Sequence, residues 1–215
     1  MGQGHTVDKL LQWNYNNSNL IEEVLFMNRN RSVYRLAVAA LLCAVGIMIP
    51  MVMPAKIYIP PMSFTLASHV AIFLAMCISP GIALAVSLGT TVGFVFSGLP
   101  LDVWLRALSH VVWAVGGALW LKKYPDTFYS TGSNLAFCAV TALVHAILEL
   151  VVVFSLYLGG MAGMAEKFAS GGFASIILLV GVGTFLHSCV DYAISLLVWR
   201  PIRKVGGVAA IATAH

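Results

Sequence analysis

The sequence predicts an all-α membrane protein with six transmembrane helices, and three observations support this prediction. Of the 215 residues, 60% are hydrophobic and 9% are charged, whereas an ordinary soluble domain has about a quarter charged residues. The mean hydropathy is +0.92. The apolar residues also gather in six runs, each close to the roughly 20 residues that a helix needs to cross a bilayer. The length that remains excludes a separate soluble catalytic or nucleotide-binding domain.

Helix-breaking residues set the boundaries of the six runs. We expect helices at about 34–53, 62–79, 81–98, 101–121, 134–158 and 171–199. Pro80-Gly81 separates the second run from the third so closely that these two form a tight helical hairpin. The runs are continuously apolar and about twice as long as a barrel strand, which disfavours a membrane β-barrel.

The segments outside the helices are short. Residues 1–30 are predicted to form a cytosolic tail or an amphipathic segment on the membrane surface. The apolar stripe of such a segment would consist of Leu10, Leu11, Trp13, Leu20, Ile21, Val24, Leu25 and Phe26. No basic stretch precedes an apolar core and a cleavage site, so a cleaved signal peptide is not indicated. Residues 31–205 then form the six-helix membrane domain, and residues 206–215 form a C-terminal tail.

Basic residues indicate the orientation, because Lys and Arg favour cytoplasmic loops. In a six-helix path, one side of the membrane collects most of them: Arg29, Arg31, Arg35, Lys122, Lys123, Arg200, Arg203 and Lys204. The opposite loops hold Lys56 and Lys167. Both termini are therefore predicted to be cytoplasmic, with the loop at 52–62 outside. Membrane orientation also explains the basic residues without a nucleic-acid partner, which would need them on one solvated face.

Ionisable side chains inside the predicted helices are few, and such groups usually face a cavity or a partner rather than lipid. Three pairs have the spacing i, i+4, namely Arg106 with His110, His145 with Glu149, and His187 with Asp191. This spacing puts both members of a pair on one helix face. His69 adds a polar group on the second helix, so polar stripes are expected to meet inside the bundle.

The predicted orientation assigns depths to these groups. Arg106 and Glu149 fall in the outer half of the membrane and are expected to share an outward-facing cavity, whereas Asp191 falls in the inner half, where a structural role is favoured. Two interpretations of Arg106 stay open. Its guanidinium matches a carboxylate or phosphate ligand, or it forms an ion pair with Asp102 or Glu149.

The histidines also allow more than one interpretation. Neutral imidazoles can simply join helices by hydrogen bonds. A metal site would need three or four converging ligands, which His69, His110, His145 and Glu149 can supply in principle, but the chain contains no HxxxH or HExxH motif. We therefore expect no metal and no cofactor, and favour an organic-ligand pocket lined by His110 and His145. The four cysteines, without a CxxC pair, are expected to be buried apolar side chains.

Small residues indicate close helix contacts, and the lack of known catalytic and ATP-binding motifs argues against enzyme activity. Ala40 and Ala44 have the small-xxx-small spacing that lets another helix approach closely, and Gly89 and Gly93 repeat it on the third helix. The sequence has no GxxxxGK[ST] loop for ATP and no GxSxG motif. The chain is therefore not expected to be an enzyme or to drive uphill transport by itself.

Over residues 27–205 the chain resembles the substrate-binding S components of energy-coupling factor (ECF) vitamin transporters. The similarity is carried by the alanine-rich first helix with Ala40 and Ala44, and by the stretches from Ile59 to Met76, Gly89 to Phe94 and Leu105 to His110. These stretches are most like those of members assigned to small carboxylate vitamins, niacin or pantothenate.

The resemblance implies that the chain works together with partner chains in the bacterial plasma membrane. The S component captures its vitamin from outside, then docks through its first helix on a shared transmembrane T component driven by two ATP-binding subunits. Ala40 and Ala44 would be the docking surface. The vitamin pocket near the outer surface would use Phe64, His69, Arg106, His110, His145 and Glu149.

Three alternatives remain at this point. The chain could serve a different vitamin. A small intramembrane enzyme could use His145 and Glu149 as acid and base, although it would need a nucleophile or a metal within reach. A non-catalytic assembly subunit could use its polar stripes only to pair helices. Turnover by the purified chain would favour the second alternative, and ligand-induced stabilisation would exclude the third.

Overall fold

A computed structural model describes residues 30–59, 62–161, 163–169 and 171–213. The chain divides into two compact units, Met1–Val38 and Ala39–His215. In the first unit the described residues, 30–38, are helical. The predicted amphipathic segment over 1–29 lies outside the described residues. All contacts below concern the second unit.

Long apolar helices dominate the described chain, as the composition predicts. Four are long and apolar enough to cross a membrane: the first helix Asn30–Val52, α4 (Leu101–Lys123), α5 (Thr131–Leu158) and the continuous stretch Gly172–Ile202. This last stretch consists of α7 (Gly172–Ile176), the π-helical η2 (Ile177–Val182) and α8 (Gly183–Ile202). Helix α3 (Pro80–Phe96) is apolar but shorter. Large apolar side chains such as Leu41, Leu119 and Leu186 are exposed on these helices, as expected for surfaces that face lipid.

The predicted helix at 62–79 is wrong in its first half. Residues Lys56–Ile59 (β1) and Met62–Thr65 (β2) form a two-stranded antiparallel sheet, with Lys56 opposite Thr65 and Ile59 opposite Met62. The helix α2 begins only at Val70 and ends at Ile78, and all nine of its residues are buried. A short apolar run cannot be told from a spanning helix by its composition, which explains the error.

The tight turn predicted between the second and third runs is confirmed. Ser79 alone separates α2 from α3, and its side-chain oxygen accepts a hydrogen bond from the backbone N–H of Ile82. Pro80 occupies the first helical position of α3, where its missing N–H costs no intrahelical hydrogen bond. The chain therefore reverses direction within one residue.

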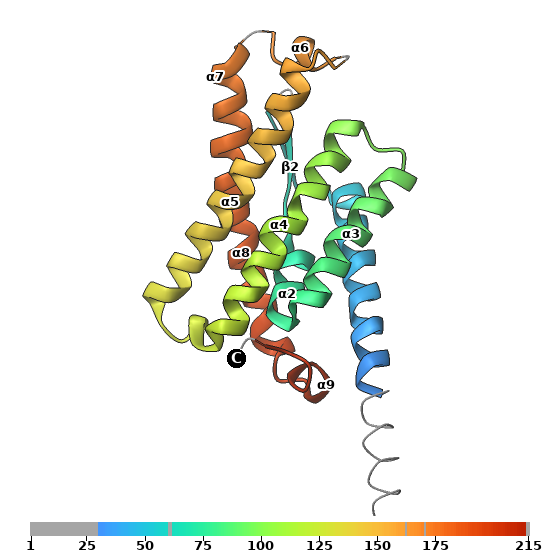
Figure 1. Cartoon of the computed structure of the whole chain (residues 1–215), viewed down its shortest axis with the longest axis vertical. Coiled ribbons are helices and arrows are strands. Elements are labelled where there is room, and N and C mark those ends of the chain that lie inside the picture. Colours follow the sequence, from blue (N-terminus) through green and yellow to red (C-terminus); the bar gives the residue numbers. More distant parts are fainter. Residues whose placement is uncertain (1–29, 60–61, 162, 170, 214–215) are drawn as a thin grey trace, which may run out of the picture. The chain divides into compact units, whose positions relative to one another are not determined.

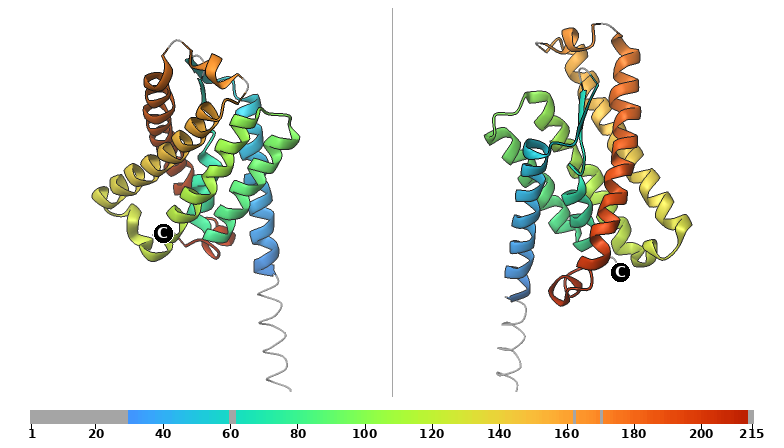
Figure 2. Two further views of the ribbon diagram at one scale, coloured as in Figure 1. Left: turned by 45° about the horizontal axis from the view of Figure 1, so that its top comes forward. Right: turned by 180° about the vertical axis from the view of Figure 1, so that it is seen from behind.

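Helix α2 lies at the centre of the second unit. It contacts α3, α4 and α8, while α4 packs on α3 and α5, and α5 packs on α8 (Figure 1). Figure 2 shows the same arrangement from two other directions, with the hairpin beside α5 and α8. Because α2 is enclosed by other helices, its apolar side chains fill the core and its N-terminal end is held inside the protein.

The first helix approaches α3 closely at the two glycines that the sequence singles out. A Cβ atom added to Gly89 would lie 2.6 Å from Cys43 Sγ, and one added to Gly93 would lie 2.2 Å from Ile47 Cδ1. Cys43 Sγ also donates a weak hydrogen bond to the carbonyl of Ala85, over 3.6 Å. The small residues of α3 thus make room for the side chains of the first helix.

Four short elements complete the described chain. They are η1 (Pro125–Phe128) between α4 and α5, α6 (Met164–Lys167) between α5 and α7, and α9 (Gly206–Ala209) after α8, together with a final turn in which the backbone N–H of Thr213 donates to the carbonyl of Cys77. This last contact holds the C-terminal segment against the end of α2.

Candidate functional site

A cavity of about 310 Å³ lies between the hairpin and the helices α2, α3, α4, α5 and α8. Five of the six pocket residues expected from the sequence line it: Phe64, His69, Arg106, His110 and Glu149. The sixth, His145, is fully buried directly behind this wall, 3.2 Å from His110 between their Nε2 atoms. The structure thus brings all six residues together, although they come from four different elements.

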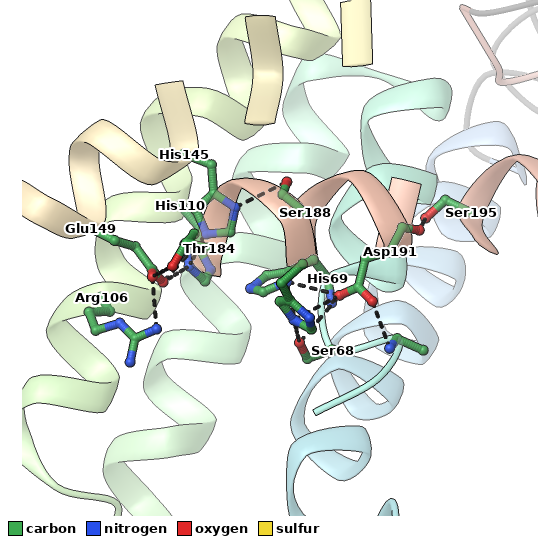
Figure 3. Close-up of polar contacts among 12 residues, drawn as sticks. Ser68, His69, Arg106, His110, His145, Glu149, Thr184, Ser188, Asp191 and Ser195 are labelled. Carbon is green, nitrogen blue, oxygen red and sulfur yellow. Dashed lines mark hydrogen bonds and ion pairs between the residues drawn. The ribbon is translucent and has the colours of Figure 1, made fainter. Parts of the chain in front are cut away.

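Arg106 and Glu149 form an ion pair between α4 and α5. Arg106 Nη2 donates to Glu149 Oε2 over 2.8 Å. The Arg106 side chain is 18% exposed, whereas that of Glu149 is 2% exposed. Both interpretations of Arg106 therefore remain compatible with the structure, because the guanidinium has an ionic partner and also lines the cavity (Figure 3).

Glu149 is the centre of the hydrogen-bond network at this wall. Its Oε2 atom also accepts a hydrogen bond from Thr184 Oγ1, over 2.7 Å. Its Oε1 atom lies 3.3 Å from His110 Nε2 and 3.4 Å from His145 Nε2. A buried carboxylate needs such partners, since a charge without them is costly in a low-dielectric interior. The i, i+4 spacing of His145 and Glu149 does place both side chains on one face of α5.

Asp191 supports the part of the cavity wall that Ser68 and His69 form. Its carboxylate is fully buried and accepts hydrogen bonds from the backbone N–H groups of Ala67 and His69, over 2.7 and 2.9 Å. The same carboxylate lies 3.0 Å from His69 Nδ1. Because these contacts hold the turn that leads into α2, Asp191 fixes both the position and the ring orientation of His69. A negative group is also favourable at a helix N-terminus.

Ser68 and His187 lie beside Asp191 and also line the cavity. Ser68 Oγ is 3.0 Å from His187 Nε2, and His187 Nε2 is 3.3 Å from Asp191 Oδ2. The i, i+4 spacing of His187 and Asp191 predicts a shared helix face, but the depth predicted for this helix favours a structural role over a place in the pocket.

The ring of Phe64 closes part of the cavity next to Gly183. A Cβ atom added to Gly183 would lie 2.6 Å from Phe64 Cζ, so the ring fits only because residue 183 has no side chain. Gly183 follows the π-helical turn η2, and such turns occur often at functional sites. Thr184, the next residue, supplies the hydroxyl that bonds to Glu149. Sequence reasoning missed both positions because neither residue type is distinctive.

The predicted docking residues and two further polar residues lie elsewhere. Ala40 and Ala44 are exposed on the first helix, so they are accessible to another helix. Ser109 Oγ donates to the carbonyl of Arg106 on its own helix. Asn134 accepts a hydrogen bond from Tyr192 and lines a separate small pocket near the end of α8.

The chemistry of the site suits a small polar ligand with an aromatic ring. The guanidinium of Arg106, three imidazoles and several hydroxyl groups line the cavity and supply polar contacts, and Phe64 supplies an apolar face. Pockets with a largely apolar wall and a few convergent polar groups are the usual form of small-molecule sites.

Comparisons with known proteins add one close similarity. Over 175 residues the chain is 38% identical to the niacin transporter NiaX of Lactococcus lactis subsp. cremoris (strain MG1363), and the alignment covers 81% of this chain and 77% of that protein. No protein-family model matches the chain, and no solved structure matches it. An identity of this size over most of both chains indicates a shared fold and a shared general role.

Proposed function

We propose that this chain, which belongs to the substrate-binding S components of ECF vitamin transporters, binds niacin in the cavity between the hairpin and helices α2, α3, α4, α5 and α8. The chain is a multi-pass cell-membrane protein. The observation that carries the choice of vitamin is the 38% identity to a niacin transporter over most of both chains. Pantothenate, the other vitamin that the sequence suggests, has no such support.

The size of the cavity supports a small vitamin. Its volume of about 310 Å³ lies at the lower end of the roughly 300–1,000 Å³ that small-molecule sites occupy. A single pyridine ring with one carboxylate fits that range, whereas a cobalamin-type vitamin does not. The ring has an aromatic neighbour in Phe64 and imidazole neighbours in His69 and His110, which also line the cavity.

The charged group of niacin would be received by Arg106. Its guanidinium provides several donors in a fixed plane, which matches the two oxygens of a carboxylate. The ion pair with Glu149 holds this plane at the wall of the cavity before a ligand arrives, and a preorganised group loses less conformational entropy when it binds. Phe64, His69, His110 and Glu149 complete the proposed pocket, with His145 supporting them from behind.

The proposed topology has six crossings, with the cavity on the outer side. The ends of α4 and α8 that carry Lys122, Lys123, Arg200 and Arg203 lie away from the cavity, which agrees with cytoplasmic basic residues and cytoplasmic termini. The second crossing would combine the turn after β2 with the nine residues of α2. Irregular backbone is tolerated at membrane depth where protein or a cavity surrounds it, and this segment lines the cavity.

Delivery to the cytosol would require partner chains. In this proposal the exposed Ala40 and Ala44 form the surface that docks on a T component, and two ATP-binding subunits supply the energy. Small side chains allow the close helix contact that such docking needs.

A ligand competition experiment tests the proposed vitamin. The purified full chain, in detergent, is loaded with labelled nicotinate and challenged with unlabelled nicotinate, nicotinamide or pantothenate. We expect nicotinate to displace the label most effectively, and nicotinamide less effectively because it lacks the carboxylate. Stronger displacement by pantothenate would reject niacin as the ligand.

A further inference from the structure

Four metal-ligating side chains converge at the wall of the cavity. His69, His110, His145 and Glu149 each offer one ligand atom, and these four atoms all lie within 4.8 Å of one another. Within this set, His110 Nε2 lies 3.2 Å from His145 Nε2. Glu149 Oε1 lies 3.3 Å from His110 Nε2 and 3.4 Å from His145 Nε2. Zinc bound at about 2.0–2.2 Å by nitrogen and oxygen in a tetrahedron separates its ligand atoms by about 3.4 Å. The spacing of these three atoms therefore matches that of a tetrahedral metal site, and the ligand atom of His69 lies within 4.8 Å of each of them.

Hydrogen bonding alone does not satisfy these three atoms. A neutral imidazole carries one proton, on one of its two nitrogens, and a carboxylate oxygen only accepts. If both Nε2 atoms carry the proton, two N–H donors lie 3.2 Å apart with no lone pair between them. If either Nε2 atom lacks the proton, its lone pair faces the carboxylate oxygen. At least one contact is repulsive in each case, whereas a cation at the centre attracts all three atoms.

The outward-facing atoms of three of the four ligands, His69, His145 and Glu149, are held by the partners that metal sites commonly have. His145 Nδ1 lies 3.3 Å from Ser188 Oγ, and His69 Nδ1 lies 3.0 Å from the carboxylate of Asp191 (Figure 3). Glu149 uses its second oxygen for Arg106 and Thr184. Metal-binding histidines usually donate their other ring N–H to a carboxylate or another acceptor, which fixes the ring and its tautomer. For His69 this leaves Nε2 as the ligand atom.

The formal charges around the cavity leave room for a further positive charge. Lys56, Arg106 and Glu149 line the cavity, and the carboxylate of Asp191 lies behind Ser68 and His69, so with neutral imidazoles these four charges cancel. A ligand carboxylate then depends on its direct contact with Arg106. A divalent ion would make the cavity positive, and His69, His110 and Glu149 line the cavity while His145 lies behind them. The side of the ion opposite His145 would therefore face the ligand, whose carboxylate would add a fifth ligand to the four-coordinate ion, an expansion that zinc accepts.

We propose that His69, His110, His145 and Glu149 bind a divalent first-row transition-metal ion, with Zn²⁺ the best match, and that this ion helps to receive the carboxylate of the vitamin. Imidazole ligands with one carboxylate suit Zn²⁺ and its neighbours in the series. This differs from the metal-free pocket expected from the sequence. The second part of the proposal rests on the proposed function, whereas the first part does not.

Metal binding is tested on the purified full chain without any vitamin. After chelator treatment and dialysis, Zn²⁺ is titrated in and the bound metal is measured by elemental analysis. Co²⁺ is used in parallel because a tetrahedral Co²⁺ site absorbs strongly in the visible range. We expect one ion per chain and the tetrahedral spectrum. Absence of bound Zn²⁺, or a six-coordinate Co²⁺ spectrum, would overturn the metal site.

Variants separate this site from the neighbouring group His69, His187 and Asp191, which could also hold an ion. His145→Ala and Glu149→Gln should each weaken Zn²⁺ binding by more than a hundredfold, and Ser188→Ala by about 10- to 100-fold through loss of an outer partner. His187→Ala should retain the metal. Loss of metal in His187→Ala with retention in His145→Ala would place the ion elsewhere and reject the proposed ligand set.

The role of the ion in vitamin binding is tested with the wild-type chain. Nicotinate affinity is measured after chelation and again after Zn²⁺ is restored. We expect at least a tenfold weaker affinity in the chelated chain and full recovery on addition of Zn²⁺. Equal affinities in the two states would reject the contribution of the ion to vitamin binding, while the metal titration would stand by itself. No nicotinate binding in either state would instead count against the proposed function.

Discussion

Arg106 Nη2 and Glu149 Oε2 are joined across α4 and α5 by an ion pair of 2.8 Å, at the wall of the cavity. The glutamate is almost completely buried, and it also bonds to Thr184 and faces His110 and His145. The Glu149 carboxylate, which the sequence predicts in the ligand pocket, therefore also holds α4, α5 and α8 together. Mutations at this pair will therefore affect both folding and binding.

Arg106→Ala should destabilise the protein as well as abolish most nicotinate binding. Removing one partner of a buried ion pair typically costs about 3–5 kcal/mol, because the other charge stays buried without compensation. The double variant Arg106→Ala/Glu149→Gln removes that charge, so its melting temperature should recover towards the wild-type value while nicotinate binding stays lost. Thermal unfolding and nicotinate titration measure the two effects. Tight binding by the double variant would exclude Arg106 as the anchor of the carboxylate.

Ala67 is predicted to tolerate glycine. Its φ angle is +67°, a left-handed conformation that costs an L-residue roughly 1–2 kcal/mol. The cost is offset because its N–H bonds to Asp191. Ala67→Gly should leave the melting temperature unchanged or raise it, since the relief of strain compensates the greater entropy of glycine in the unfolded chain.

The matched control is Ala71→Gly, inside α2. Ala71 is fully buried and helical, so glycine there should lower stability by about 1 kcal/mol or more. Equal losses of stability in the two variants would mean that the turn before α2 does not adopt the left-handed conformation.

The close contact between the first helix and α3 should fail when Gly93 gains a side chain. Gly93→Val would press on Ile47, and overpacking of this kind typically costs about 1–3 kcal/mol. Adding Ile47→Ala should restore part of the loss, because it removes the atoms that clash. Gly116→Val serves as the control, since a Cβ atom there has no neighbour within 4 Å. If Gly93→Val melts at the wild-type temperature, the two helices do not pack in this way.

If Ala40 and Ala44 form the docking surface, substitutions there should weaken association with the T component and leave vitamin binding unchanged. Ala40→Trp/Ala44→Trp should leave nicotinate affinity within about twofold of wild type, because neither residue lines the cavity. It should prevent co-purification with a T component, because bulky side chains block close helix contact. Leu135→Trp, at an exposed position on α5, is the control and should still form the complex. Intact complex formation by the alanine variant would remove the first helix as the docking surface.

The sequence predicted the long helices because proline and glycine end each apolar run. It did not predict the hairpin, because four-residue strands such as Lys56–Ile59 are too short to show a period of two. The spacing of His145 and Glu149 predicted a shared helix face. These two residues are also two ligands of the proposed metal site. A search for HxxxH motifs does not find them, because one of the two ligands is a glutamate.

Contacts between helices were the part that sequence reasoning could not supply. The predicted depth of Asp191 favours a structural role, but it does not predict that Asp191 holds His69 and the start of α2 beside the cavity. That contact depends on α2 beginning deep inside the protein, at residue 70 rather than 62. A residue's depth along one helix does not determine what it meets when the neighbouring helix is shorter than expected.

The most direct test of the account is equilibrium binding of labelled nicotinate to the purified full chain in the absence of any partner. The account predicts saturable binding of one nicotinate per chain, with most of it lost in Arg106→Ala/Glu149→Gln. Absence of saturable binding by a folded wild-type chain, with or without added Zn²⁺, would contradict the claim that this cavity captures the vitamin.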